Sequence, residues 1–376
     1  MSRQFINGGQ AIAQGAISAG CNFFAGYPIT PATPILHHMF RELPKVGGVA
    51  IQGEDEIASI GMCIGAAMTG AKCMTATSGP GMSLYSENIG LAIMGEVPLV
   101  VIDVMRLGPA TGGATTVGQG DVQFARWGTP GGYPIIALSP TNPSDCYSLT
   151  IRAFKLARRF RCPVFLLTDR EVVATMSTSE SDGNSENESG TVDEGLKEPD
   201  PFVPYLIHEL SDVPFLSPYG GKNIVRFTGS THDENGYLTK TSEKVERLNA
   251  HLAAKIDRYT QEIESVTVDL QEGARTLLVS FGISARSSLE ATQLLRQKGK
   301  KISNLIIHSL WPVPTNSITK TLSGIKRIVV PELNLGQYRM EIERVTQRID
   351  NGIEVIGINR VDGELINPRQ IMEAVI

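Results

Sequence analysis

Three adjacent carboxylates precede a segment of the sequence that carries no charge. Glu54, Asp55 and Glu56 are followed by an uncharged run from Ile57 to Ala71. Acids at the amino end of a helix stabilise it by about 1 kcal/mol, which explains Glu54 and Asp55 without any chemistry. Glu56 points in another direction, so it is the candidate for a chemical role.

The predicted helix behind Glu56 is built largely from small residues. They are Ala58, Gly61, Gly65, Ala66 and Gly70. We expect so small a surface to pack very closely on one side, where a carboxylate would lose its hydration. Loss of hydration favours the protonated form, which is useful if Glu56 shares a proton with a heterocycle.

A strand, a glycine-rich turn and a helix are predicted in succession at residues 75–90. Thr77, Ser78 and Gly79 end the strand, and Pro80 and Gly81 lead into the helix. Glycines let the backbone approach a ligand closely, and a helix start offers unbonded N–H groups. No G-K-[ST] sequence follows, so this is not a phosphate loop; an ordinary strand–turn–helix remains the alternative to a ligand-binding turn.

Two more candidate groups follow predicted strands. Thr30 lies in the proline-rich turn at 27–34, which would hold its hydroxyl in a cleft or use it as a helix cap. Arg106 comes directly after a buried strand and precedes a loop rich in glycine and threonine. An arginine in that place is suited to binding a carboxylate through two hydrogen bonds; the alternative is a solvated strand end.

The sequence predicts no metal site. Gly120 and Asp121, with Asn142 further on, loosely resemble the G-D-G…N pattern of a site for diphosphate and magnesium, but Val122 replaces the second glycine. The six histidines form no metal-binding pattern, and none of the five cysteines forms a C-x-x-C pair. We therefore expect reduced thiols, as in a cytoplasmic protein, and no iron–sulfur cluster held by this chain alone.

Composition narrows the class of protein. The chain has 376 residues, 41% of them hydrophobic and 19% charged, with a net charge of -5. It has no basic run, so nothing favours nucleic acid as a partner. We also find no secretory signal and no apolar run of about 18 residues that would span a membrane, which favours the cytoplasm.

Helix and strand patterns alternate along the sequence, which indicates an α/β protein. The predicted elements position the candidate groups described above. We predict three parts: a first α/β domain at 1–176, an acidic linker with an irregular segment and a connecting helix at 177–265, and a second α/β domain at 266–376. The acidic stretch 177–201 has no bulky apolar run and is expected to be a flexible linker. The long helix is predicted over 242–265.

Several of these segments together resemble one family. "YPITP" (27–31), "EDEIASIG" (54–61), "TATSGPG" (75–81), "RLGPATG" (106–112), "QGD" (119–121) and "ARWG" (125–128) are similar to the α subunit of 2-oxoacid:ferredoxin oxidoreductases, the 2-oxoglutarate type above all. "SFGISARSSLEA" (280–291), "LWPVP" (310–314) and "VPELNLGQ" (330–337) resemble the transketolase C-terminal domain of that family. The order and spacing of the set make the resemblance specific.

The resemblance implies a fold, cofactors and partners. The first domain would bind the pyrimidine of thiamine diphosphate, with a transketolase C-terminal-like domain behind it. A β subunit would hold the diphosphate, Mg²⁺ and a [4Fe–4S] cluster, and a γ subunit and a ferredoxin-like subunit are expected as separate chains. The reaction would be oxidative decarboxylation of a 2-oxoacid, 2-oxoglutarate to succinyl-CoA, with coenzyme A taking the acyl group and ferredoxin the electrons.

The resemblance also assigns roles to residues. Glu56 would hydrogen-bond the pyrimidine N1′ and favour the imino form that removes the thiazolium C2 proton. Thr30 would contact the 2-oxoacid and Arg106 would bind its carboxylate. The cofactor pocket would be lined by Tyr27, Pro28, Ile29, Thr77, Ser78 and Gly79. A branched-chain or pyruvate type of α subunit, and a non-catalytic scaffold subunit, remain as alternatives; a self-contained decarboxylase would need the diphosphate-binding half that is missing here.

Overall fold

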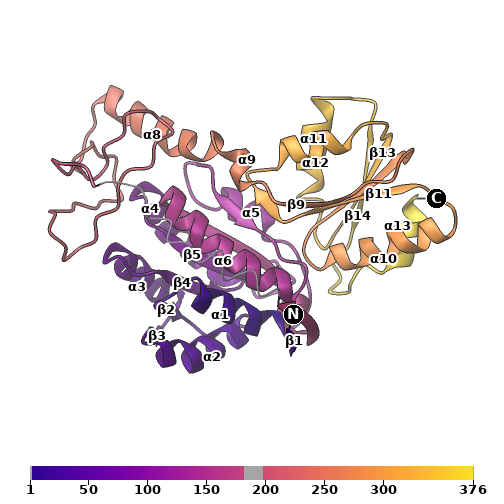
Figure 1. The fold of residues 1–376 in the computed structure, drawn as a ribbon, viewed down its shortest axis with the longest axis horizontal. Helices are drawn as coiled ribbons and strands as arrows, with labels where there is room; N and C mark the ends of the chain where they lie inside the picture. The colour runs from indigo at the N-terminus through magenta and orange to yellow at the C-terminus, as the bar shows by residue number, and fades with distance from the viewer. Residues whose placement is uncertain (1, 182–197, 376) are drawn as a thin grey trace.

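The computed structural model of the chain describes residues 2–181 and 198–375. Two mainly parallel sheets, each covered by helices, lie side by side (Figure 1). In the first sheet the strand order is β12-β6-β7-β5-β4-β2-β3. Its parallel strands are β2 (Phe23–Gly26), β3 (Val49–Gln52), β4 (Cys73–Thr77), β5 (Leu99–Met105), β6 (Ile136–Leu138) and β7 (Pro163–Asp169).

The first sheet separates two hydrophobic cores. Along β5, Val100, Ile102 and Val104 belong to one core, and Val101 and Met105 to the other. This alternation follows from the period of two residues in a strand. The first core is covered by α1 (Gly8–Ser18), α2 (Thr33–Glu42), α6 (Pro143–Phe160) and α7 (Arg170–Ala174); the second by α3 (Glu56–Met68), α4 (Gly79–Met94) and α5 (Val122–Trp127).

The second sheet has the strand order β14-β13-β10-β11-β9. Its members are β9 (Val266–Asp269), β10 (Thr276–Ser280), β11 (Ile302–Ile307), β13 (Arg327–Glu332) and β14 (Glu354–Asn359), with β9 the antiparallel edge. The helices of this half are α10 (Ser284–Gln297), α11 (Thr315–Thr321), α12 (Arg339–Gln347) and α13 (Pro368–Val375).

The structure differs from the sequence-based expectation at the joins between the predicted parts. Strand β12 (Ser309–Trp311) lies beyond residue 266 but pairs antiparallel with β6, so the second half contributes an edge strand to the first sheet. Strand β8 (Ser177–Ser181), at the start of the predicted linker, pairs with β1 (Ser2–Ile6). Residues 182–197 of the acidic stretch lie outside the described residues. The predicted helix 242–265 is divided into α8 (Ser242–Asp257) and α9 (Thr260–Ile263).

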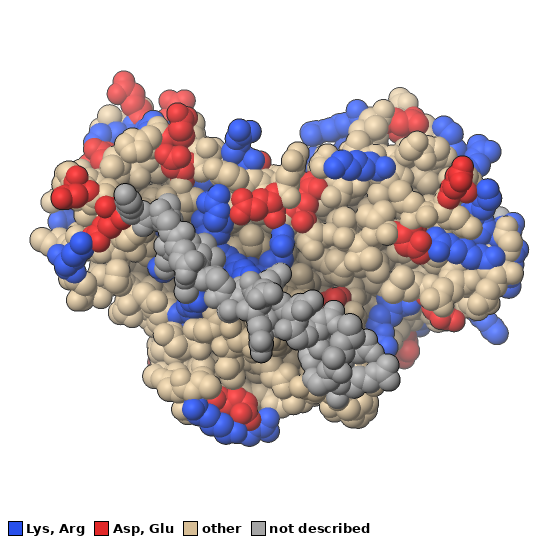
Figure 2. Space-filling model, viewed as in Figure 1, with Lys and Arg blue, Asp and Glu red and all other residues tan. Residues whose placement is uncertain are grey.

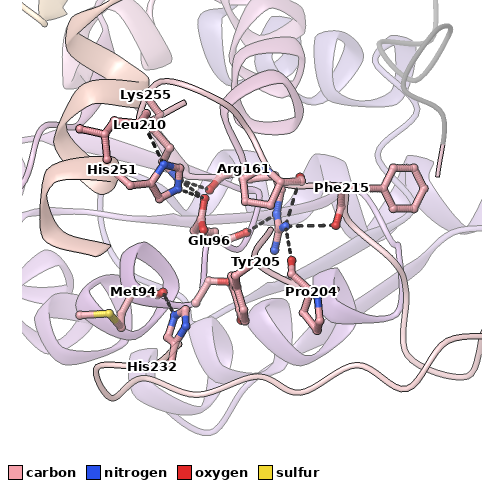
Figure 3. A network of polar contacts seen from close by, with 12 residues as sticks. Met94, Glu96, Arg161, Pro204, Tyr205, Leu210, Phe215, His232, His251 and Lys255 are labelled. Carbon is pink, nitrogen blue, oxygen red and sulfur yellow. Dashed lines mark hydrogen bonds and ion pairs between the residues drawn. The ribbon is translucent and has the colours of Figure 1, made fainter. Parts of the chain in front are cut away.

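A buried ionic cluster fixes the segment between the two halves to the amino end of β5 (Figure 3). Glu96 forms the turn before β5 and accepts hydrogen bonds from Lys255 Nζ at 2.7 Å and His251 Nε2 at 3.1 Å. Arg161 donates to the Glu96 carbonyl and to the carbonyls of Pro204, Pro214 and Phe215. These contacts hold both α8 and the irregular segment in place.

The surface carries charge of both signs. Figure 2 shows Lys and Arg interspersed with Asp and Glu over both halves, including a small patch of both signs at the lower edge of this face. No helix within residues 2–181 and 198–375 has the length and apolar character that a membrane span needs.

Candidate functional site

The candidate residues gather where β2, β4 and β5 end. These neighbouring strands are parallel, so the segments that follow them leave the same edge of the sheet. The turn at 27–31 follows β2, Thr77 ends β4, and Arg106 comes directly after β5. The topology therefore brings together three segments that are far apart in the sequence.

The three adjacent acids have three different environments. Glu54 is exposed, and Asp55 is the N-cap of α3, where its Oδ1 accepts a hydrogen bond of 2.7 Å from the Ala58 N–H. Glu56 is the first residue of α3 and is only 7% exposed. A buried carboxyl that takes no part in the cap is left available for a ligand.

Glu56 meets the turn after β4 at Gly81. A Cβ added to Gly81 would lie 2.9 Å from Glu56 Cγ and 3.1 Å from Glu56 Oε1, and would overlap Thr77 Oγ1. The close approach of α3 to α4 at this point therefore requires glycine. Thr77 and Ser78 are fully buried, and their hydroxyl oxygens have no hydrogen-bond partner among the described residues.

These groups fit the polar edge of a nitrogen heterocycle. Buried hydroxyls are normally hydrogen-bonded, so those of Thr77 and Ser78 are expected to find a partner in a ligand. A carboxyl such as that of Glu56 can donate to or accept from a ring nitrogen. Within the described residues no group of three or more His, Cys, Asp or Glu side chains is placed to hold a metal ion.

The expected close packing along α3 is wrong for Gly61 and Gly65. A Cβ on either glycine would meet no atom within 4 Å, and Ile57 on the same face is 50% exposed. Residues 57, 61 and 65 repeat every four positions and so share the outer face of the helix, whereas the buried face carries Ile60 and Ile64. The tight contact lies at the head of the helix, between Glu56 and Gly81.

Arg106 and Thr30 are brought together across 76 positions of sequence. The guanidinium of Arg106 donates from Nη1 to the Thr30 carbonyl oxygen at 2.5 Å, and its Nε has no partner among the described residues. Arg106 is 6% exposed, whereas Thr30, Pro28 and Tyr27 are exposed and Ile29 is half-buried. The arginine is thus anchored to the 27–31 turn and keeps a donor free for an anion.

The structure adds Asp103, which the sequence analysis missed, and Asp121, which it considered only as part of the rejected diphosphate–magnesium pattern. Burial, then the neighbouring Asp121 carboxyl, raises the pKa of Asp103 well above its usual range. Burial also raises the pKa of Asp121 to about 6, against the lowering effects of a hydrogen bond from Asp103 and the charge of Arg106. Asp103 is the single charge in the apolar run 97–105, and that was the signal in the sequence that could have found it.

Two family models match this chain. Residues 14–251 match the thiamine-diphosphate-binding family of pyruvate flavodoxin/ferredoxin oxidoreductases. Residues 274–371 match core domain II of pyruvate:ferredoxin oxidoreductase.

Among curated relatives, the 2-oxoglutarate synthase subunit KorA of Methanocaldococcus jannaschii is 41% identical over 381 residues, covering 100% of both chains. The ketoisovalerate oxidoreductase subunit VorB of Methanothermobacter thermautotrophicus is 32% identical over 376 residues, covering 100% of this chain and 97% of that one.

Solved structures confirm the predicted fold class. The 2-oxoglutarate:ferredoxin oxidoreductase from Magnetococcus marinus, solved with 2-oxoglutarate, coenzyme A and succinyl-CoA bound, superposes with a TM-score of 0.91 at 31% identity. It covers 99% of this chain, which spans 64% of that one. A split-gene transketolase at 14% identity, with a TM-score of 0.58 over 99% of this chain and 97% of that one, shares the fold.

Proposed function

The chain belongs to the pyruvate flavodoxin/ferredoxin oxidoreductase family, and from this we propose that it is the α subunit of a thiamine-diphosphate-dependent 2-oxoglutarate:ferredoxin oxidoreductase. The reaction is the oxidative decarboxylation of 2-oxoglutarate to succinyl-CoA, with the electrons passed to ferredoxin. The observation that carries the proposal is the buried Glu56 carboxyl, which meets the turn of Thr77 and Gly81, where the Thr77 and Ser78 hydroxyls are buried without a partner among the described residues. A subunit with only a scaffold role would need neither.

Glu56 is proposed as the catalytic residue of this chain. Thiamine diphosphate, when bound, supplies the carbanion chemistry that decarboxylation of a 2-oxoacid requires. Glu56 would exchange a hydrogen bond with the pyrimidine N1′ and hold the proton that selects its reactive form. Burial makes the carboxyl suitable, because a hydrogen bond from Glu56 to the cofactor would be shielded from water there and so be stronger than one at the surface.

Arg106 and Thr30 are proposed to bind the 2-oxoacid. The free Nε of Arg106 and the anchoring of its Nη1 to Thr30 leave the guanidinium oriented for a carboxylate. The remaining contacts to the cofactor are proposed for Tyr27, Pro28, Ile29, Thr77, Ser78 and Gly79, which lie at the ends of the neighbouring strands β2 and β4. No metal contact is proposed for this chain.

A β subunit is proposed to complete the site. Around the site three apolar side chains are exposed: Tyr27 by 37%, Ile57 by 50% and Leu84 by 45%. A partner would cover this apolar surface. The diphosphate, Mg²⁺ and the [4Fe–4S] cluster are assigned to that β subunit, because the five cysteines here are buried and free and the described residues hold no cluster of three or more such side chains that could bind a metal. A γ subunit, a ferredoxin-like subunit and ferredoxin itself are proposed as the further partners.

Similarity supports 2-oxoglutarate as the substrate, since the identity to a 2-oxoglutarate synthase subunit is 41% and that to a ketoisovalerate oxidoreductase subunit is 32%. The test is anaerobic co-purification of the chain with its partner subunits. Viologen reduction is then assayed with coenzyme A and, in turn, 2-oxoglutarate, pyruvate and a branched-chain 2-oxoacid. The proposal predicts the highest kcat/KM for 2-oxoglutarate. Preference for another 2-oxoacid would overturn the substrate, and no reduction with any of them would overturn the function.

A further inference from the structure

A short segment between β5 and α5 packs on two turns that are proposed to bind ligands. Residues 118–123, here called the strap, run from the loop after β5 into α5. A Cβ added to Gly118 would lie 2.9 Å from the carbonyl carbon of Arg106. A Cβ added to Gly79 would lie 3.2 Å from each carboxyl oxygen of Asp121. The strap therefore touches both the backbone that carries Arg106 and the turn that follows β4.

Gln119 anchors the strap to the second half of the molecule. It is fully buried, its N–H donates to the Leu333 carbonyl at 2.9 Å, and its carbonyl accepts from Asn334 Nδ2 at 2.8 Å. Its side-chain Oε1 accepts from the Leu333 N–H at 3.0 Å and from Ser284 Oγ at 3.2 Å. Its Nε2 donates to the Phe281 carbonyl at 3.4 Å. Hydrogen bonds are directional, so together they fix the position and the orientation of this residue.

A second glutamine extends the anchor along the strap. Gln337 Nε2 donates to the Gly120 carbonyl at 2.7 Å, and Gln337 Oε1 accepts from the Gln123 N–H at 2.9 Å. The Gln337 carbonyl also accepts from Gln123 Nε2 at 2.9 Å. Residues 333–337 form the connection between β13 and α12. One turn of the second half thus holds the strap at residues 119, 120 and 123.

Cohesion of the two halves does not by itself explain these bonds. The halves are also joined by the pairing of β12 with β6 and by the Ile283 N–H, which donates to Asp169 Oδ2 at 2.7 Å. Apolar contacts would add cohesion without fixing a direction. Glycines at 118 and 120 flank Gln119 and give the backbone wide freedom unless it is anchored. The hydrogen bonds therefore determine where the strap lies.

We propose that Gln119 is a positioning residue for the site in the first domain. Through the strap, the 333–337 turn of the second half sets the places of Arg106 and of the turn at Gly79. It thereby sets the affinity for the carboxylate of a 2-oxoacid and for thiamine diphosphate. This inference rests on the proposed function, because it assigns these two ligands to the two turns.

The place of Glu56 is set by a different contact. Its carboxyl side chain meets Gly81 at the head of α3, whereas the strap meets Gly79 and Arg106. Loss of the anchor should therefore weaken binding of both ligands and leave the rate at saturation nearly unchanged. A residue that only stabilised the fold would change neither quantity while the protein stays folded.

The test is Gln119→Met in the complex assembled with its partner subunits, since methionine has nearly the same length and makes none of the side-chain hydrogen bonds. KM for 2-oxoglutarate and Kd for thiamine diphosphate should each rise by roughly three- to tenfold, with kcat within about twofold of the wild type. Gln337→Met should shift both constants in the same direction by a smaller factor, because the bonds of Gln119 remain. This half-buried position also provides the test if Gln119→Met does not fold.

Asn304→Leu is the matched control. Asn304 in β11 is also buried, and its Nδ2 donates to Thr292 Oγ1 at 2.9 Å within the second half. The control loses a buried amide and its hydrogen bond, so its stability should fall while KM, Kd and kcat stay at the wild-type values. Equal shifts of KM in Asn304→Leu and Gln119→Met would overturn the proposal, as would a lower kcat of Gln119→Met with KM unchanged.

A second readout needs no turnover and no cofactor. Hydrogen–deuterium exchange of the full chain should be roughly tenfold faster in Gln119→Met than in the wild type for the amides of the strap and of the turn at Gly79. Asn304→Leu should leave these amides unchanged. Exchange at the wild-type rate in Gln119→Met overturns the positioning role. If exchange is faster but the wild-type complex turns over no 2-oxoacid, the anchor stands and the proposed function fails.

Discussion

Glu56 and Gly81 approach so closely that a single methyl group would not fit between them. A Cβ on residue 81 would lie 2.9 Å from Glu56 Cγ and would overlap the Thr77 hydroxyl oxygen. This contact joins the head of α3 to the first turn of α4, so it fixes the position of the carboxyl on which the proposed chemistry depends. Because the contact is steric, it can be tested without altering a charge.

Gly81→Ala is predicted to lower turnover of the assembled complex by tenfold or more, because an overpacked contact shifts Glu56 and Thr77 and costs about 1–3 kcal/mol. Gly61→Ala is the matched control for the stability of the isolated chain, since a Cβ there meets nothing within 4 Å in this chain. The control should raise stability by roughly 0.5–1 kcal/mol, as alanine does in a helix interior. Thermal unfolding measures the stability of both variants and viologen reduction the turnover of Gly81→Ala; turnover of Gly81→Ala equal to that of the wild type would contradict the steric account.

Arg106→Ala is predicted to raise the KM for 2-oxoglutarate by roughly 10- to 100-fold and to leave the affinity for thiamine diphosphate unchanged. Each factor of ten corresponds to about 1.4 kcal/mol of lost binding, within the range of a charge-assisted pair of hydrogen bonds. The KM of Arg106→Lys should fall between those of the wild type and Arg106→Ala, because lysine keeps the charge but cannot make the paired hydrogen bonds. Steady-state kinetics and cofactor titration provide the measurement. An unchanged KM would count against the role of Arg106.

Lys255→Met is predicted to destabilise the chain by about 3–5 kcal/mol, because it leaves Glu96 buried without its ammonium partner. The variant with both Glu96→Gln and Lys255→Met should recover much of this loss, as removal of both charges does in buried pairs. Chemical denaturation of Glu96→Gln, Lys255→Met and the double variant gives the free energies of unfolding. Additive losses would show that the two charges do not stabilise each other.

The buried cluster of Glu96, Lys255 and His251 also predicts that the chain loses stability in acid. Burial alone would raise the pKa of Glu96, but Lys255 and His251 outweigh it and hold that pKa well below its usual range. A depressed carboxyl pKa contributes stability above the unfolded value, about 4.3, and this contribution is lost as pH falls below it. Unfolding experiments below about pH 4 should therefore show a steeper loss in the wild type than in the double variant.

Asp169 is expected to change the stability with pH in the direction opposite to Glu96. Burial raises its pKa to about 7, although the Ile283 N–H donates to it at 2.7 Å and joins the two halves of the molecule. The folded state therefore holds this proton more tightly than the unfolded state, and the stability contributed at low pH is lost as pH rises from about 4 to 7, by up to about 1.4 kcal/mol per unit. Asp169→Asn should flatten this slope in denaturation curves. An equal slope in the variant would contradict the assignment.

Features set by neighbouring residues could be predicted from the sequence. The cap by Asp55 and the separate position of Glu56 follow from residue order at a helix start, and the strand that ends at Thr77 follows from its apolar run. The outward face of Gly61 and Gly65 was mispredicted, because periodicity tells which residues share a face and not which face is covered.

Contacts between segments far apart in the sequence could not be predicted from it. The pairing of β12 with β6 and of β1 with β8 joins segments roughly 170 positions apart, and no local pattern encodes a partner strand. The contact of Asp121 with Gly79 depends on how the 107–121 loop folds back toward the turn after β4. Such contacts are fixed by tertiary packing, which overrides local preference.

The most direct test of the central claim is Glu56→Gln in the complex assembled with its partner subunits. Glutamine has nearly the same size but cannot hold or release the proton, so the complex should assemble, bind thiamine diphosphate and lose activity by roughly 100-fold or more. Viologen reduction with 2-oxoglutarate and coenzyme A is the measurement, with co-purification of the subunits as the control. Turnover within twofold of the wild type would contradict the catalytic role of Glu56.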